Sequence, residues 1–422
     1  MTGFQEKNGV LHVDNIPLPR IAEEFGTPAY VYSASVIRGQ HKRLKDALAR
    51  AIPADRQPML CYACKANTNI AILKLLKTLG TGLEIVSEGE LAKGLKAGFS
   101  GGEIISTSFG KTPEEIRACL EADIAQFNIE SFTELEQLND TAAEMGKTAR
   151  VLFRLNPNIS GGGHAKISTG RKRDKFGMSA PTIMEAYKRA DEMSHLEPIG
   201  LSMHIGSQVS QVEAFKPAFE KLSDMVQELR SNGYSVTRLD IGGGFPIIYN
   251  DEKLLDLDEY ARWVNDIVVP LGTEIQMEPG RYLVGNAGVL LTKVLYVKET
   301  QEQDFLVLDA AMNDLIRPTL YEAYHGIRPV QNLAAPKQSY DVVGPICESG
   351  DTFTKGREIP QMKMNDLAVI ETAGAYGSAM ASNYNTRPLL PEILVDGDKI
   401  AVIRKRQTIQ EIIDQESIPD WA

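Results

Sequence analysis

A lysine follows one of the short apolar runs of the chain, in the segment Tyr-Ala-Cys-Lys-Ala-Asn at residues 62–67. If the run is a buried strand, Lys65 stands at its end, beside a poorly hydrated interior. Burial lowers the pKa of an amine and makes the amine a nucleophile toward a carbonyl carbon. A solvated surface lysine is the alternative, and this segment alone leaves both open.

Two further apolar runs end in residues suited to an anion or to an aromatic ring. His204 and Ser207 belong to His-Ile-Gly-Ser-Gln, where the imidazole could stack on a flat ligand or shuttle protons. Gly242, Gly243 and Gly244 follow the next run, and successive glycines let backbone N–H groups converge on an anion. Their spacing is not that of the dinucleotide-binding motif. A core histidine and a tight turn without a ligand are the alternatives.

Carboxylates, a guanidinium, a thiol and a phenol occur in three more segments. Glu278 and Arg281 belong to Glu-Pro-Gly-Arg, where a structural ion pair is the alternative to a site. Cys347 and Glu348 are adjacent, and a thiol beside a carboxylate in a turn is a candidate acid–base pair, although a buried inert cysteine is commoner. Tyr376, in Gly-Ala-Tyr-Gly, could place its phenol near a phosphate.

The elements that must position these residues alternate along the chain between about residues 58 and 282. Eight short apolar runs, fairly rich in β-branched residues, predict strands covered on both faces. The runs lie at 59–64, 83–86, 103–106, 124–128, 150–155, 199–205, 237–241 and 274–278. Amphipathic segments between them predict helices, such as 131–145 with Ser131 and Glu134 as a capping box. Eight such units predict a (β/α)8 TIM-type barrel, whose catalytic groups lie at the C-terminal ends of the strands.

Both ends of the chain have a different pattern, with short strand-like runs, turns and little helix. These runs lie at 10–13, 29–32, 288–297, 304–309, 340–343, 367–371 and 399–403. We therefore expect the barrel to occupy residues 37–282, and residues 1–36 and 283–422 to form one mainly β domain. The Gly- and Lys/Arg-rich segment 156–176 predicts an active-site loop at the C-terminal end of the barrel, with a disordered surface excursion as the alternative.

Composition limits the class of partner. The 422 residues include 45 Lys and Arg against 56 Asp and Glu, a net charge of −11 that argues against nucleic acid and anionic membranes as partners. No apolar run approaches the ~18 residues of a membrane span, and the N-terminus lacks the pattern of a signal peptide. Four cysteines are too few for a disulfide scaffold, and Cys61 and Cys64 lack the second pair of a zinc site, so no metal is expected. We expect a cytoplasmic protein with reduced thiols.

The candidate residues together describe one ligand. They supply an amine for a carbonyl, a glycine cradle for a phosphate, a ring to stack and a carboxylate for a protonated ring nitrogen. Pyridoxal 5'-phosphate needs these four groups.

The sequence resembles the fold-type III pyridoxal-phosphate-dependent decarboxylases, which have an alanine racemase-like barrel. The resemblance covers nearly the whole chain, in order. Its motifs are YACKAN, EIVSEGEL, HAKISTG followed by KFGM, HIGSQ, GGGF, EPGR, RPTLY, CESGD and AGAYG.

The resemblance assigns roles to the candidate residues. Lys65 would bond covalently to the cofactor's aldehyde carbon, His204 would stack on its ring, and Glu278 would pair with its ring nitrogen. Cys347 would donate the proton that replaces the lost carboxylate. The residues implied to bind the cofactor are Lys65, His204, Ser207, Gly242, Gly243, Gly244, Glu278, Arg281 and Tyr376. The residues implied to bind the substrate are Arg281, Arg317, Tyr321, Glu348 and Tyr376.

Within the family, the resemblance is to the branch that converts meso-2,6-diaminopimelate into L-lysine and CO2, the last step of lysine biosynthesis. Guanidinium groups bind carboxylates bidentately and Glu348 suits an ammonium, so the substrate set fits a distal amino-acid head group. A carboxylate at the ring nitrogen favours decarboxylation over racemisation. The alternatives are a related decarboxylase for ornithine, lysine, carboxynorspermidine or a carrier-bound amino acid, a racemase, and an inactive binding homologue.

In the family, the segment equivalent to the one around Cys347 comes from a second subunit, so the resemblance implies a homodimer with shared active sites and dimer contacts from the β domain. Two positions depart from the family. Glu84 stands where the family usually has Asp, and Glu88 where it usually has Gly. Because both departures are carboxylates, the sequence does not fix the net charge around Lys65.

Overall fold

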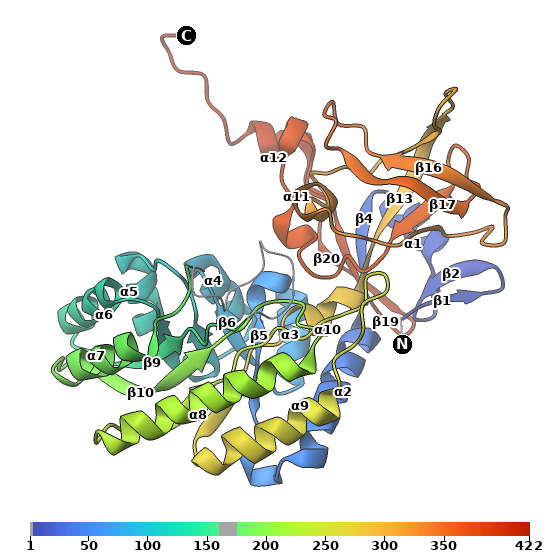
Figure 1. Ribbon diagram of the computed structural model, residues 1–422. Coiled ribbons are helices and arrows are strands. Elements are labelled where there is room, and N and C mark those ends of the chain that lie inside the picture. The colour runs from blue at the N-terminus through green and yellow to red at the C-terminus, as the bar shows by residue number, and fades with distance from the viewer. Residues whose placement is uncertain (1–2, 160–174) are drawn as a thin grey trace. The chain divides into compact units, whose positions relative to one another are not determined.

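The structure is a computed structural model that describes residues 3–159 and 175–422 (Figure 1). The described chain divides into two compact units. Of the described residues, 40–159, 175–248 and 252–283 form the barrel unit, and 3–39, 249–251 and 284–422 form the β unit. Most of the expected active-site loop at 156–176, including the HAKISTG motif, lies outside the described residues.

Within the described ranges, the barrel unit is built on eight parallel strands that close on themselves in sequence order. The strands are β5 (Met59–Ala63), β6 (Gly82–Ile85), β7 (Ile104–Ser106), β8 (Gln126–Ile129), β9 (Ala149–Leu155), β10 (Leu196–Met203), β11 (Arg238–Asp240) and β12 (Glu274–Met277). The last strand pairs with the first through Gln276 and Met59, which closes the barrel. The predicted (β/α)8 barrel is confirmed, with strand ends displaced by a few residues.

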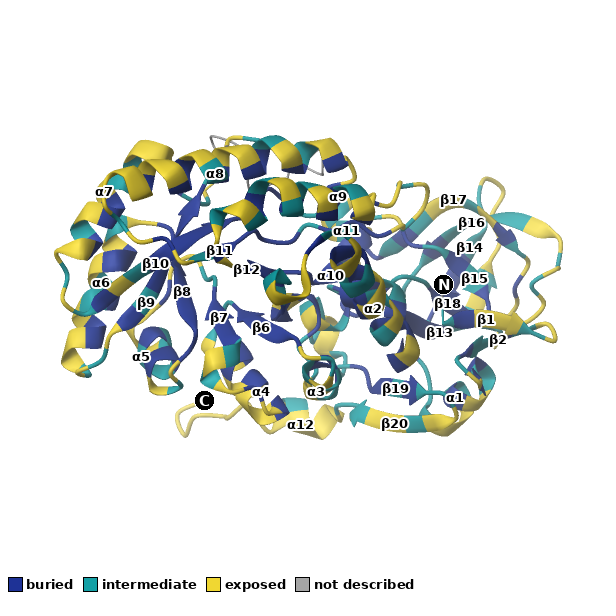
Figure 2. Ribbon diagram, turned by 90° about the horizontal axis from the view of Figure 1, so that it is seen from below, coloured by how far each residue is buried: buried dark blue, intermediate teal, exposed yellow. Residues whose placement is uncertain are grey.

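Helices separate the strands along the chain, as the amphipathic segments predicted. They are α3 (Ile70–Thr78), α4 (Glu88–Ala97), α5 (Pro113–Glu121), α6 (Phe132–Glu144), α7 (Ala180–Asp191), α8 (Phe215–Ser231) and α9 (Leu257–Trp263). In addition, α2 (Ala34–Ala51) precedes β5 and α10 (Arg281–Val284) follows β12. Each long helix turns a buried stripe toward the strands and an exposed face outward, as α8 does in Figure 2.

The start of α6 corrects one expectation. Ser131 caps the helix by accepting a hydrogen bond from the Glu134 backbone N–H, as predicted. The Glu134 carboxylate does not complete a capping box, because it accepts from the backbone N–H of Glu130 and from the buried ammonium of Lys111. A buried ammonium needs a counter-charge more than an exposed helix end needs a second cap.

In its described residues, the β unit contains a small three-stranded sheet and a larger nine-stranded sheet. The small sheet consists of β1 (Phe4–Lys7), β2 (Val10–Val13) and β3 (Ile16–Pro17). The larger sheet consists of β4 (Ala29–Ser33), β13 (Gly288–Lys298), β14 (Phe305–Leu308), β15 (Ile327–Pro329), β16 (Lys337–Val343), β17 (Thr352–Pro360), β18 (Leu367–Ile370), β19 (Glu392–Asp396) and β20 (Lys399–Arg404). β4, from the N-terminal end of the chain, pairs with both β13 and β19. The predicted mainly β domain built from both chain ends is therefore confirmed.

Short helices complete the β unit: α1 (Leu18–Phe25), α11 (Arg317–Tyr321) and α12 (Ile409–Ile413). Apolar side chains of both chain ends share one core, in which Leu11, Val31, Leu291 and Ile393 are fully buried. Across the described parts of the chain, no helix has the length and apolar character needed to cross a membrane.

Candidate active site

Lys65 lies directly beyond β5, in a single helical turn formed by Cys64–Ala66. Its ammonium donates to both carboxylate oxygens of Glu84, with Nζ–Oε1 and Nζ–Oε2 distances of 2.9 and 3.0 Å. The Glu84 side chain is completely buried on β6, whereas 42% of the Lys65 side chain is exposed. Burial raises the pKa of Glu84 to about 7, and Lys65 opposes that rise. The Lys65 side chain is thus partly accessible and has a base with a near-neutral pKa beside it.

The two departures from the family pattern have different surroundings. Glu84 is the partner of Lys65, whereas Glu88 is exposed in the first turn of α4. Glu90, two residues later, is buried and accepts from the backbone N–H of Val86 at 2.8 Å. Glu84, and not Glu88, therefore decides the charge next to Lys65.

Glu278 follows β12 and is buried among other polar groups of the barrel. The Thr107 hydroxyl donates to its Oε1 at 3.0 Å. Burial, and after it the negative charge of Asp240, raises the pKa of Glu278 to about 8. This carboxyl therefore holds a proton near neutral pH until a positive charge lies beside it.

His204 and the glycines meet beyond β10 and β11. The backbone N–H of Gly243 donates to Nδ1 of His204 at 3.1 Å, so Nδ1 carries no proton. Burial lowers the pKa of His204 well below its usual value, and the positive charges of Arg154 and Lys65 act in the same direction. The imidazole is therefore neutral, which suits a ring that stacks rather than one that pairs with an anion.

The glycine loop could not be made from other residues. A Cβ atom at Gly242, Gly243 or Gly244 would lie 2.3, 2.1 or 2.4 Å from a backbone carbonyl oxygen of the neighbouring loops. Gly242 and Gly244 also have φ values of +71° and +93°, which side chains disfavour. Close by in the fold, Arg281 donates to the Ser207 hydroxyl at 3.2 Å. The barrel unit thus brings together Ser207 with Arg281, and His204 with the glycine loop.

The remaining candidate residues belong to the β unit. Arg317 begins α11, where its Nη1 donates to Nε2 of His325 at 2.7 Å and its guanidinium lies 4.5 Å from the centre of the Tyr249 ring. Tyr321 ends α11 and is partly exposed. Tyr376 is also partly exposed and has a left-handed backbone, with φ +55°.

Cys347 and Glu348 lie in the turn between β16 and β17, and both are exposed. The buried carboxylate of Asp351 shapes this turn by accepting from the backbone N–H groups of Ile346 and Met312 at 2.7 and 2.6 Å. The pKa of the Tyr384 phenol lies above its usual value, first because the phenol hydrogen-bonds to Glu348. In contrast to Cys347, Cys61 and Cys64 are buried and free, as expected for small interior residues.

Three polar residues that the sequence reasoning did not select also face this part of the barrel: Thr107, Asn128 and Asp240. Asn128 and Asp240 are buried near the C-terminal ends of β8 and β11, and their side chains hydrogen-bond at 3.0 Å. A signal was present, because both are polar residues inside runs that otherwise read as buried strands.

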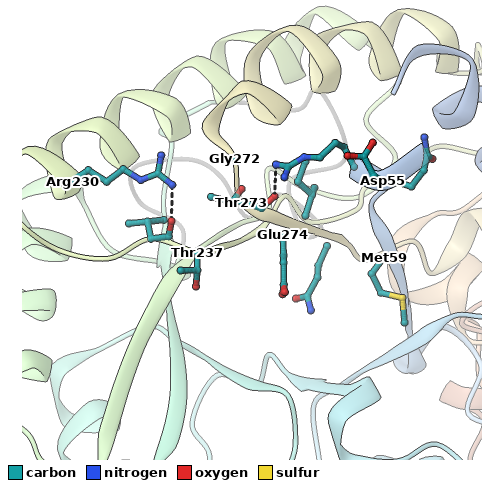
Figure 3. A pocket seen from close by; sticks show the side chains of 12 residues that line it. Asp55, Met59, Arg230, Thr237, Gly272, Thr273 and Glu274 are labelled. Carbon is teal, nitrogen blue, oxygen red and sulfur yellow. Dashed lines mark hydrogen bonds between the residues drawn. The ribbon is translucent and has the colours of Figure 1, made fainter. Parts of the chain in front are cut away.

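A cavity of about 520 Å³ lies at the opposite, N-terminal end of the barrel strands (Figure 3). Its lining includes Met59, Val236, Thr237, Thr273, Glu274 and Gln276. The two arginines there donate to backbone carbonyls: Arg56 to Thr273 at 3.1 Å, and Arg230 to Val236 and Leu271 at 2.6 and 2.8 Å. These hydrogen bonds connect the segments at the N-terminal end of the barrel strands to one another. Catalytic residues of such barrels lie at the other end, so we place the candidate active site at the C-terminal mouth.

The residues of the mouth fit pyridoxal phosphate. Lys65 offers an amine, the glycine loop has no room for side chains and can approach a phosphate closely, and the neutral His204 can stack on a ring. Glu278 offers a buried carboxyl for a ring nitrogen.

Comparison with known proteins agrees with this geometry. The family model described as "Pyridoxal-dependent decarboxylase, pyridoxal binding domain" matches residues 34–285. The chain is 43% identical to diaminopimelate decarboxylase of Pseudomonas aeruginosa over 99% of both chains, and 41% identical to that of Zymomonas mobilis over the whole of both.

Among solved structures, it is similar to diaminopimelate decarboxylase of Helicobacter pylori complexed with L-lysine. The TM-score is 0.90 and the identity 38%, over 94% of this chain and 98% of that one. It is also similar to the enzyme of M. jannaschii in co-complex with L-lysine, with a TM-score of 0.92 and 36% identity over 99% of both chains.

Proposed function

The chain belongs to the diaminopimelate decarboxylase family of pyridoxal-dependent decarboxylases, and we propose that it removes one carboxylate of meso-2,6-diaminopimelate to give L-lysine and CO2. The observation that carries the proposal is the contact between the ammonium of the partly exposed Lys65 side chain and the buried Glu84 carboxylate at the barrel mouth. Full-length similarity to diaminopimelate decarboxylases supports the choice of substrate.

Pyridoxal phosphate, when bound, supplies an electron sink for the negative charge left on the α-carbon as CO2 departs. Lys65 must lose a proton before its amine can bond to a carbonyl carbon. Glu84 lies 2.9 Å from Nζ and, with its pKa of about 7, is the base placed to hold that proton. Glu278 would hold a proton at the ring nitrogen, and the neutral His204 would support the ring face.

The β unit, together with Arg281 of the barrel unit, would select the substrate. Arg317, Arg281 and Tyr376 are suited to the carboxylates, Glu348 to an ammonium, and Tyr321 to lining the distal end. His325 supports this role of Arg317, because its Nδ1–H donates to the Glu371 carbonyl and leaves Nε2 to accept from the guanidinium. Cys347 would deliver a proton to one face of the α-carbon after CO2 has left.

We further propose a homodimer whose active sites are shared, and a cytoplasmic location with reduced thiols. The exposure of Cys347 and Glu348 supports sharing, because an acid that protonates a carbanion must be shielded from bulk water. A second chain packed over this turn would supply that shield.

The test is CO2 release from a panel of amino acids by the cofactor-loaded protein. We expect meso-diaminopimelate to react with the highest kcat/KM and to yield L-lysine. Faster turnover of ornithine or lysine would contradict the substrate assignment and favour a related decarboxylase.

Arg317→Ala tests the recognition of the distal carboxylate. We expect a roughly 10- to 100-fold loss of kcat/KM on diaminopimelate, because a charge-assisted bidentate contact is removed. The matched control is Arg117→Ala, which removes an exposed arginine of α5 that pairs with Glu144. Unchanged diaminopimelate turnover in Arg317→Ala would show that this arginine does not bind the substrate.

A further inference from the structure

Asp240 ends β11 directly below the glycine loop and is 1% exposed. Its Oδ1 accepts from the backbone N–H of Gly242 at 3.0 Å, and its Oδ2 accepts from Nδ2 of Asn128 at 3.0 Å. It also hydrogen-bonds to the carboxyl group of Glu278. One buried side chain is therefore joined both to the loop expected to hold the phosphate and to the acid expected at the ring nitrogen.

A second path joins the same two carboxyl groups. Nδ2 of Asn128 donates to the Thr107 hydroxyl oxygen at 3.1 Å, and that hydroxyl donates to Oε1 of Glu278 at 3.0 Å. The direction of this path is fixed from below, because Nε2 of Gln126 donates to Oδ1 of Asn128 at 3.0 Å. Asn128 must then turn its amide N–H groups toward Thr107 and Asp240.

These directions determine where a proton can lie. Both oxygens of Asp240 accept N–H bonds, which favours its ionised form, and Oε1 of Glu278 accepts an O–H bond. Two carboxyl groups that hydrogen-bond to each other need one proton between them. The remaining position for that proton is Oε2 of Glu278.

The charges around the pair are mixed. Burial raises the pKa of Asp240 and Glu84 acts in the same direction, whereas the hydrogen bonds from Glu278, Gly242 and Asn128 lower it. Lys65 and Arg154 lower the pKa of Glu278 without offsetting burial and the charge of Asp240. The Cys61 thiol also lies near both carboxyl groups, and burial together with these carboxylates, against the opposing charge of Arg238, raises its pKa well above its usual value. Cys61 is therefore neutral, and the carboxyl pair holds the proton that titrates.

We propose that Asp240 is a positioning residue whose ionised carboxylate keeps a proton on Glu278 and anchors the first N–H of the glycine loop. The buried pair then carries one proton and one negative charge. Its link to a cofactor rests on the proposed function, but the shared proton is a property of the cofactor-free chain. The two claims can therefore fail separately.

The test is infrared spectroscopy of the cofactor-free protein during a pH titration, with the C=O stretch of a protonated carboxyl as the readout. Subtracting the Glu278→Gln spectrum assigns the band. In the wild type we expect the band to persist above neutral pH and to disappear around pH 8, the pKa of Glu278.

In Asp240→Asn the neighbouring negative charge is absent, so Glu278 ionises more easily. We expect the midpoint to fall by about one pH unit or more, a roughly tenfold loss of proton affinity. Asp224→Asn, at an exposed position on α8, is the matched control and should leave the midpoint unchanged. An unchanged midpoint in Asp240→Asn, or the absence of a band assigned to Glu278 in the wild type, would overturn the proposal.

A kinetic readout separates positioning from a merely structural role. In the loaded protein, Asp240→Asn removes a negative charge that would favour a proton at the ring nitrogen, so kcat should fall roughly tenfold. The KM for diaminopimelate should stay near the wild-type value, because the substrate-binding residues of the β unit are untouched. A raised KM at unchanged kcat would contradict a role through Glu278. If the protein released no CO2 but the infrared result held, the proposed function would fail and this inference would stand.

Discussion

The barrel mouth and the 345–351 turn of the β unit both carry candidate catalytic groups. The ionisable side chains are buried at the mouth and exposed in the turn. At the mouth, Glu84 and Glu278 are buried, and each has hydrogen-bond partners within the same unit. In the turn, Cys347 and Glu348 are exposed. Burying a charge is costly unless partners compensate for it, and at the mouth one chain supplies those partners. The exposed pair gains a low-dielectric setting only when another surface covers it.

The largest effect is expected from Lys65→Ala at the mouth. Loss of the nucleophilic amine should lower kcat/KM by roughly three orders of magnitude or more and abolish the visible absorbance of the loaded protein. Lys96→Ala, at an exposed position on α4, is the matched control. A Lys65→Ala protein that keeps both its visible absorbance and its kcat/KM would show that the barrel mouth takes no part in the reaction.

The next effect is expected in the exposed turn. Cys347→Ala removes the proposed proton donor and should lower kcat roughly 100-fold or more, whereas the cofactor's absorbance should stay. Cys119→Ala, at a buried position on α5, is the cysteine control. Loss of cofactor binding in Cys347→Ala would contradict the division of roles between the two regions.

A smaller effect concerns the stability of the cofactor-free protein. Glu278 has a folded-state pKa of about 8 against a usual 4.5, so the folded state binds more protons than the unfolded state between these values. The free energy of unfolding should therefore fall as pH rises from about 5 to 8, by up to a few kcal/mol. Denaturant unfolding at both pH values should show a smaller fall in Glu278→Gln and an unchanged one in Asp224→Asn. An equal fall in all three proteins would show that Glu278 is not protonated in the folded chain.

The smallest effect is expected from Glu88→Gly, which restores the residue usual in the family. The side chain is exposed in the first turn of α4, where an acidic residue contributes about 0.3–1 kcal/mol through the helix dipole. We expect a slightly lower Tm and unchanged kcat and KM. A change in KM would place Glu88 in contact with the ligand.

The sequence predicted the parts of the fold that have regular patterns. Eight apolar runs sufficed to predict the barrel. The sequence also predicted that Lys65, His204, the glycines and Glu278 follow strands, and in the structure they follow β5, β10, β11 and β12. It missed β17, since the Thr352–Pro360 strand is mostly polar and partly exposed and has no apolar run. It also missed β19, a short strand that forms a hairpin with β20 and pairs over a long range with β4.

Asp240 is a polar residue inside an apolar run, but the sequence did not indicate what it contacts. Its partner Asn128 lies 112 positions away, and no local pattern predicts that contact. The capping box at Ser131 was wrong for the same reason, since Lys111 competes for the Glu134 carboxylate from another element. Non-local partners of buried charges therefore mark the limit of the sequence reasoning.

The most direct test of the contrast between the mouth and the turn mixes two inactive proteins, Lys65→Ala and Cys347→Ala. If active sites are shared, each mixed dimer contains one site with both Lys65 and Cys347 intact. Random exchange should then restore about a quarter of wild-type CO2 release per chain. Mixing Lys65→Ala with the double variant is the control and should restore nothing. If tagged subunits exchange but no activity returns above that control, the two regions do not act together across a dimer and the account is wrong.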